Sequence, residues 1–308
     1  MLWLKLAMVL VLTTNAARAT ELNDFAGTWV LRLGQRNLFV LTLVVEGDRV
    51  VGRFDRPVKF TSNGDTFGDI RGGVAHDTVV FARLADGMLH FKVQSATNPK
   101  DQDAYTLTLK QDHSHAEFAF DDLPAGVVLQ PRSFERASAT ATVATDWEPN
   151  RLYSLTDSDV PNAEMKAIFD EDQRVRASGK IDWNVVSKTD AERRQRTRKL
   201  LADGALHTGK DYEEAAFVFQ HGETSDDYLL AHTLAMVAVS KGDASALWIA
   251  TASLDRYLQA IGQKQVFGTQ YFSDANNHWT QKPYNRDLVS DALRKQLGYH
   301  PRRLKSNS

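Results

Sequence analysis

The period of the hydrophobic pattern changes once along the chain, and this change limits the possible folds more than any other feature. Short β-branched and aromatic runs fill residues 21–136, and apolar and polar residues alternate in runs such as 105–109. Such alternation is typical of strands with one buried face. Beyond residue 160 the apolar residues recur at helical spacing. The pattern therefore predicts an α+β chain, with an N-terminal antiparallel β-barrel and a C-terminal bundle of antiparallel helices.

The charge and the cysteine content exclude several classes of function. The chain has 308 residues, with 37 Lys and Arg against 39 Asp and Glu. This near-neutral balance argues against nucleic acid binding through bulk positive charge. The chain contains no cysteine, which excludes disulfides, thiolate nucleophiles and cysteine-held metal clusters. The sequence also lacks a glycine-rich phosphate loop, a Gly-x-Ser-x-Gly elbow and a His-Glu-x-x-His motif.

The first 19 residues predict a secretory signal peptide. Lys5 precedes an apolar run over 6–12, and Ala17 and Ala19 form a small-x-small cleavage site. We therefore expect a periplasmic or secreted protein with no membrane span after signal cleavage.

The remaining boundaries follow from shifts in composition. The uncharged Ala/Thr-rich stretch at 137–145 and the Glu-Pro-Asn at 148–150 separate the β pattern from the helical pattern. The predicted organisation has five parts: signal peptide 1–19, β-barrel domain 20–136, linker 137–160, helical domain 161–300 and disordered tail 301–308.

The β half predicts short strands at intervals of roughly ten residues, as in an up-and-down barrel. Turns are expected at 46–48, at 75–77 and at 85–87. The expected strands cover 38–45, 48–54, 67–71, 78–84, 88–93, 104–110 and 115–120.

The beginning of this half resembles lipocalin-like barrels through the sequence Gly27-Thr28-Trp29. The resemblance implies that Trp29 closes one end of the barrel and that an arginine of the last strand, Arg132 or Arg136, packs over it. Two interiors remain open for a barrel of this size: a core filled by side chains, or a cavity for one apolar ligand.

Capping residues predict the helices of the second half. An early helix is expected over 163–178. Asp190 is expected to cap a basic helix over 191–202. Its run of arginines is consistent with contact to phosphate or an anionic surface, but the flanking acidic residues favour a solvated or salt-bridged face. The expected later starts are a capping box of Asp211 with Glu214, then Ser225, Asp243 and Asn285.

Three motifs in this half are similar to those of an uncharacterised bacterial domain family, a domain of unknown function. They are Gln220-His221 at a helix end, Asp255-Arg256 on a later helix, and Gly268-Thr269-Gln270 in a loop. The similarity covers about 163–300 and implies an organisation and candidate residues, but no reaction.

Helix geometry predicts one polar end of the helical domain. The helix that contains Asp255 returns to the end that holds Gln220 and His221, so the loop after it begins beside them. Glu223 or Asp172 is the expected orienting partner of His221, and His232 is expected level with Asp255 or Arg256. The predicted ligand-binding residues are Gln220, His221, Arg256, Gln265, Thr269 and Gln270.

Two functions are consistent with this set, and both leave open that the polar end only caps helices. The first is a binding module in the cell envelope for a polar small molecule, a peptide or glycan, or a protein partner. The second is a hydrolase in which His221, or His232 with Asp255, acts as general base. We expect no metal held by His221 and His232, because they lie on the order of 10 Å apart along the helices. We also expect no cofactor.

Overall fold

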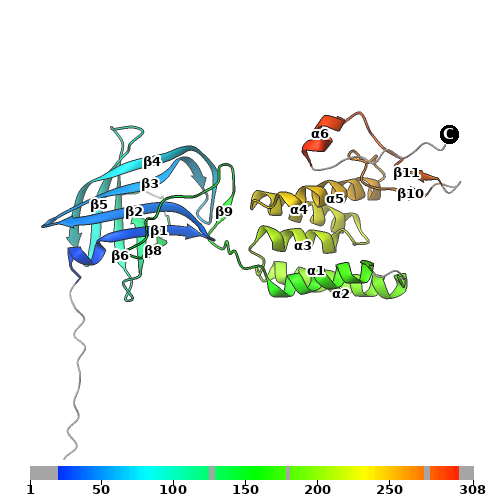
Figure 1. Ribbon diagram of the computed structural model, residues 1–308, viewed down its shortest axis with the longest axis horizontal. Coiled ribbons are helices and arrows are strands. Elements are labelled where there is room, and N and C mark those ends of the chain that lie inside the picture. The colour runs from blue at the N-terminus through cyan, green and yellow to red at the C-terminus, as the bar shows by residue number, and fades with distance from the viewer. Residues whose placement is uncertain (1–19, 125–128, 178–180, 274–277, 298–308) are drawn as a thin grey trace, which may run out of the picture. The chain divides into compact units, whose positions relative to one another are not determined.

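The computed structural model describes residues 20–124, 129–177, 181–273 and 278–297 (Figure 1). It shows an α+β chain in which strands come first and helices follow. The expected signal peptide at 1–19 and the expected tail at 301–308 lie outside the described residues.

The N-terminal half forms a closed antiparallel barrel from strands β1 to β8. The strand order is β3-β2-β1-β8-β7-β6-β5-β4, and an additional pairing between β3 and β4 closes the sheet. The strands are β1 (Gly27–Leu33), β2 (Arg36–Glu46), β3 (Arg49–Ser62), β4 (Thr66–Ala85), β5 (Met88–Gln94), β6 (Gln102–Leu109), β7 (His115–Phe120) and β8 (Arg132–Arg136).

Strand β4 corrects one prediction from the sequence. The expected turn at 75–77 is wrong, because β4 runs without interruption from Thr66 to Ala85. Ala75 and Asp77 both point inward and are buried, so the alternation of a strand continues through this position. The carboxylate of Asp77 tolerates burial because the Arg56 guanidinium lies 2.6 Å away.

Aromatic side chains fill the interior of the barrel. The ring of Phe118 lies 4.6 Å from Tyr105 and 4.8 Å from Phe134, measured between centroids. Phe54 stacks on Phe118 at 5.4 Å, and Phe91 lies 5.7 Å from Tyr105. These contacts favour the filled core over the cavity for an apolar ligand.

The end of the barrel near β1 shows the packing that the Gly-x-Trp sequence implies. Trp29 is fully buried, and its indole N–H donates to the Phe25 carbonyl oxygen at 2.9 Å. The guanidinium of Arg136, rather than that of Arg132, lies 4.2 Å from the centroid of the Trp29 ring.

Helices occupy the C-terminal half. In Figure 1, α1 and α2 lie side by side and α3, α4 and α5 follow. Apolar side chains of these helices share one core, which includes Ile168, Phe219, Leu234 and Ile249. The helices are α1 (Ala163–Ala177), α2 (Trp183–Ala202), α3 (Gly209–Phe219), α4 (Ser225–Ser240), α5 (Leu247–Ala260) and α6 (Asp291–Gln296), with short 3-10 turns η1 (Leu22–Phe25) and η2 (Ala244–Ala246).

Three helix starts differ from the prediction. Asp182, not Asp190, caps α2. Asp190 is instead buried inside that helix and bonds Arg176 of α1. The two remaining differences are a capping box of Thr208 with Asp211 on α3 and a Ser290 cap on α6.

Two starts follow the sequence. Asp243 accepts the Ser245 N–H and caps η2, which runs into α5. Helix α4 begins at Ser225 as expected, behind the Thr224 cap.

The packing divides the chain into two compact units. One contains residues up to Leu31, Phe39–Arg56 and Val74–Thr145. The other contains the chain from Asp146 onward together with Arg32–Leu38 and Pro57–Gly73. Part of the expected linker therefore belongs to the helical unit.

The segment after Asp146 is packed within this second unit. Tyr153 is fully buried in β9 (Tyr153–Ser154), which pairs with β4 at Thr66 and Phe67.

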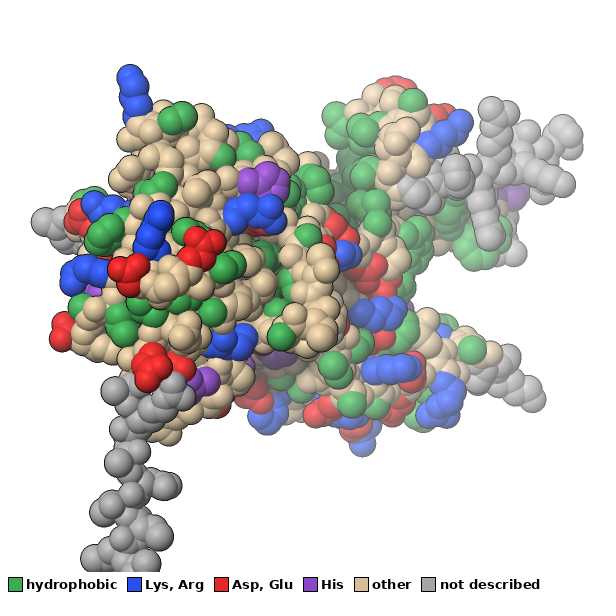
Figure 2. Space-filling model, turned by 60° about the vertical axis from the view of Figure 1, so that its left-hand side comes forward, with side chains coloured by type: hydrophobic (Ala, Val, Ile, Leu, Met, Phe, Trp, Pro, Cys, Tyr) green, Lys and Arg blue, Asp and Glu red, His purple; other side chains and the backbone are tan. Residues whose placement is uncertain are grey.

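The surface of the barrel has no dominant charge in the view of Figure 2, where basic, acidic and apolar side chains are interspersed. Among the described helices, none combines the length and the apolar character needed to cross a membrane.

Candidate functional site

An aspartate–histidine pair lies where α1 meets the turn after α3. His221 follows the end of α3, and its Nδ1 lies 3.1 Å from Oδ1 of Asp172 on α1. The structure thus selects Asp172, rather than Glu223, as the orienting partner. The His221 side chain is 16% exposed, and within the described residues its Nε2 has no protein partner. The imidazole is held at one nitrogen and open at the other.

A buried ionic network holds the aspartate of this pair. Asp172 is 1% exposed and accepts from the Arg176 guanidinium at 2.6 Å. Arg176 also bonds Asp190 of α2 at 2.7 Å, and Asp190 in turn bonds the fully buried Arg193. The two arginines and two aspartates pair with one another, so the network fixes the position of Asp172.

Arginines of the basic run of α2 form ion pairs with acidic residues, as the sequence predicts. Arg194 donates to the His221 carbonyl oxygen at 2.8 Å and so holds the turn after α3. Arg198 bonds Asp227 at the start of α4. These contacts position the turn after α3 and the start of α4.

Arg256 on α5 is a further cationic group of this region. It is partly buried, and its Nε is buried without a hydrogen-bond partner. Burial lowers the pKa of Arg256, an effect that interaction with the Tyr228 hydroxyl opposes and that the charge of Arg176 reinforces. The Tyr228 hydroxyl donates to the Gly222 carbonyl oxygen at 2.8 Å, next to His221 in sequence. Arg256, Tyr228 and His221 therefore belong to the same end of the helices.

Asp255 has a different role from the one considered in sequence. It is fully buried, and its two oxygens accept from the N–H groups of Val266, Phe267 and Thr269 and from the Thr269 hydroxyl at 2.8–3.0 Å. A carboxylate with four such donors fixes the loop after α5. Asp255 is a structural anchor.

The two glutamines of this loop complete the same anchor. Gln265 is fully buried. Its side-chain amide donates to the Gln270 carbonyl oxygen and accepts from the Gln270 N–H, each at 3.0 Å. The Gln270 side chain donates to the Ala252 carbonyl oxygen and to the Thr269 hydroxyl. Gln265, Thr269 and Gln270 are thus engaged within the loop and with α5.

The structure therefore separates the predicted polar end into two clusters. Across the described residues, no hydrogen bond or ion pair joins the Asp172–His221 network to the Asp255 anchor. His232 does not meet Asp255 either, because its Nδ1 contacts the Ala250 carbonyl oxygen at 2.9 Å. Gln220 is buried at the C-cap of α3.

Sequence reasoning missed an aromatic strip that crosses three helices. Phe169 of α1 lies 5.6 Å from Phe217 of α3, and Phe217 stacks on Trp248 of α5 at 5.9 Å. Trp248 is 43% exposed. Phe169 precedes Asp172 by three residues and Phe217 precedes His221 by four, so these two residues lie about one helical turn from the pair. A comparison of aromatic positions on α1 and α3 would have revealed it.

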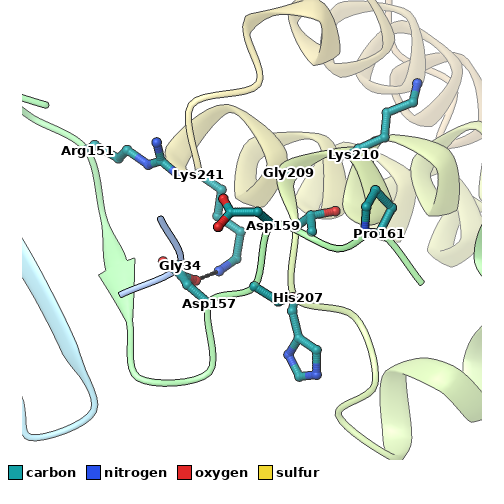
Figure 3. A pocket seen from close by; sticks show the side chains of 11 residues that line it. Gly34, Arg151, Asp157, Asp159, Pro161, His207, Gly209, Lys210 and Lys241 are labelled. Atoms are coloured by element: carbon teal, nitrogen blue, oxygen red, sulfur yellow. Dashed lines mark hydrogen bonds and ion pairs between the residues drawn. The ribbon is translucent and has the colours of Figure 1, made fainter. Parts of the chain in front are cut away.

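A small cavity lies at the opposite end of α3. It encloses about 180 Å³, less than the roughly 300–1,000 Å³ of most ligand sites. In Figure 3, Lys241 reaches Asp157, with which it forms an ion pair at 2.5 Å, whereas His207 and Lys210 extend away from that pair. Arg151, also in its wall, bonds Glu148 at 3.0 Å. Lys241 and Arg151, two cations of its wall, are thus paired with carboxylates of the protein.

Comparisons with known proteins find no match for this chain. The chain matches no family model, no curated protein and no solved structure. Within the residues that the structure describes, no group of three or more His, Asp and Glu side chains lies close enough to hold a metal ion.

Proposed function

We propose that this chain is an exported protein of the cell envelope whose helices act as an antiparallel bundle and bind a polar ligand around His221. The ligand class is a polar small molecule, a peptide or glycan, or an envelope partner. The observation that carries the proposal is the Asp172–His221 pair, in which one imidazole nitrogen is held at 3.1 Å and the other is open.

The surroundings of His221 favour binding. Asp172 is held by Arg176 within the buried network, so the imidazole presents Nε2 in a defined direction at little cost in conformational entropy. Phe169 and Phe217 of the aromatic strip lie about one turn away, and the strip offers ring faces that pack on the apolar face of a sugar or peptide. A fixed polar atom beside partly exposed rings is the usual composition of a small-ligand site.

Two substitutions of His221 test this proposal. In His221→Asn the amide takes the place of Nδ1 and keeps the bond to Asp172, whereas the Nε2 position is lost. His221→Gln places an amide near Nε2 and removes the bond to Asp172. The probes are the N-acetylglucosamine dimer, tri-alanine and glutamine, which represent a glycan, a peptide and an amide.

We expect at least one probe to bind the wild-type chain in calorimetric titration. We expect His221→Asn to weaken that binding by about tenfold or more, as for a lost hydrogen bond in a desolvated site, with a Tm close to that of the wild type. Equal binding by His221→Asn and the wild type, or binding of none of the three probes, contradicts the proposal.

The same pair supports a second function, a hydrolase in which His221 is the general base. A carboxylate that holds Nδ1 places the basic lone pair on Nε2, the atom that accepts a proton from water or from a hydroxyl. Hydrolysis of a p-nitrophenyl ester or of an anilide by the wild-type chain, lost in His221→Asn and reduced in Asp172→Asn, would identify the enzyme. Binding of a probe without turnover favours the binding module.

The export part of the proposal rests on the sequence of residues 1–19. The lipocalin-like character of the barrel and the family resemblance of the helical half remain part of the same proposal. Detection of a mature chain that begins at Thr20 in the periplasmic fraction tests the export. A full-length chain in the cytoplasm would refute it.

A further inference from the structure

The charge of Arg256 is not neutralised by the protein. Other buried arginines of the helical half have carboxylate partners: Arg193 bonds Asp190, and Arg294 bonds Asp291 at 2.8 Å. Within the described residues, Arg256 forms no ion pair, and its Nε is buried without a hydrogen-bond partner. A partly buried guanidinium without a counter-ion is unfavourable, since it loses hydration and gains no pairing.

The neighbours of Arg256 increase this unbalanced charge. The adjacent residue in the chain, Asp255, has both oxygens occupied by the loop after α5. Arg176 lies near enough to repel it electrostatically, and the charge of Arg176 is already shared between Asp172 and Asp190. The Tyr228 hydroxyl interacts favourably with the Arg256 guanidinium. The Arg256 guanidinium therefore carries a charge that a bound anion would neutralise.

We propose that Arg256, positioned by Tyr228, binds an oxyanion of the ligand, either a carboxylate or a phosphate group. The inference rests on the proposed function and specifies the charge of the ligand recognised beside His221. The guanidinium offers planar N–H donors suited to two oxygens of one anion. The Tyr228 hydroxyl, whose proton is donated to the Gly222 carbonyl oxygen, helps to position the guanidinium. Through Gly222, Tyr228 connects this anion position to the turn that carries His221.

A stability signature distinguishes this role from a structural one. An arginine that is kept for ligand binding lowers the stability of the free protein, whereas an arginine kept for structure raises it. Arg256→Met preserves the length and the apolar packing of the side chain and removes the charge. We therefore expect the free Arg256→Met chain to have a Tm equal to or above that of the wild type.

The binding experiment uses the full chain with inorganic phosphate and with acetate, each compared with chloride at equal ionic strength. At ten times its dissociation constant, the bound oxyanion should raise the wild-type Tm by about 3–5 °C. The rise should vanish in Arg256→Met and be smaller in Arg256→Lys, because an ammonium cannot form the paired N–H contacts. Arg174→Gln, an exposed arginine of α1, is the matched control and should respond as the wild type does.

The outcomes separate this inference from the proposed function. A response to phosphate alone identifies a phosphate ligand, and a response to acetate alone identifies a carboxylate. The inference is overturned if neither anion exceeds chloride, if Arg256→Met responds as the wild type does, or if Arg256→Met lowers the Tm of the free protein by more than about 5 °C. If a neutral probe then binds through His221 in the Arg256→Met chain, the proposed function stands without the anion. If the oxyanion instead binds while His221→Asn retains all probe binding, the anion site stands and the His221 site falls.

Discussion

Replacement of Asp255 by asparagine should destabilise the loop after α5. The carboxylate is fully buried and accepts four hydrogen bonds, from Val266 N–H, Phe267 N–H, Thr269 N–H and the Thr269 hydroxyl. In Asp255→Asn the side-chain amide oxygen retains the two bonds to Val266 and Phe267 but without charge assistance, which costs about 1 kcal/mol in all. The side-chain amide nitrogen then faces the Thr269 N–H, a buried donor left unsatisfied at about 2 kcal/mol.

The total of about 3 kcal/mol corresponds to a fall in Tm of about 6–12 °C. Urea unfolding measures the free energy, and hydrogen exchange measures the opening of the loop directly. The amides of Val266, Phe267 and Thr269 should lose protection in Asp255→Asn, while the α3 and α4 amides keep theirs if the loop opens locally. Asp287→Asn, at an exposed position, is the control and should change the free energy by less than about 0.5 kcal/mol. An Asp255→Asn chain of wild-type stability with unchanged protection would refute the anchor role.

Two further predictions concern charges in the same half of the chain. Burial alone would raise the pKa of Asp227, but hydrogen bonds from Arg198 and from the Glu223 N–H lower it overall below its ordinary value of 3.8. The ionised Asp227 carboxylate therefore stabilises the folded chain fully above about pH 5. This stabilisation is lost as the pH falls through the folded-state pKa. In urea titrations between pH 7 and pH 2, Asp227→Asn should lower the free energy of unfolding at pH 7 and weaken its dependence on acid; an unchanged acid slope would contradict this. Lys241→Met breaks the buried ion pair of Lys241 with Asp157 and should lower the free energy of unfolding by about 3–5 kcal/mol. The double variant Lys241→Met/Asp157→Asn should lower it by less than the sum of the two single losses. Additive losses in that double-mutant cycle would show that the two groups do not interact.

The barrel was largely predictable because period-two alternation depends only on neighbouring residues. Most strands expected in 38–120 match a strand of the barrel, and Trp29 meets an arginine of the last strand. The turn expected at 75–77 failed because an aspartate in a sequence resembles a turn residue. Asp77 is instead buried against Arg56, a partner 21 positions away that no local pattern reveals.

Helix starts show the same limit. Asp182 and Asp190 both precede helical runs, and local sequence does not distinguish a capping aspartate from one inside a helix. The structure distinguishes them through Arg176 of the preceding helix, which holds Asp190 in place. The existence of the helices was predictable from period, whereas their first residues depended on tertiary ion pairs.

The candidate site was predictable only in part. Asp172 was among the two expected partners of His221, and the structure shows this contact. The topology of short connections put Gln265, Thr269 and Gln270 beside His221, although these residues bond one another and Asp255. Chain topology indicates which end of a domain a residue occupies, but not whether its hydrogen-bonding groups are already taken.

The helical unit is made of segments that are distant in the chain, and this affects the order in which they can fold during synthesis. During synthesis the hairpin at 57–73 emerges well before Tyr153, yet β4 pairs with β9 at Thr66 and Phe67. Until residues 146–154 follow, this hairpin has an unpaired strand edge, the kind of edge that invites pairing with other chains. A nascent or truncated chain that stops near residue 145 should therefore associate with itself more readily than the full chain. A division of the gene at the Ala/Thr-rich stretch would not separate two self-sufficient folding units.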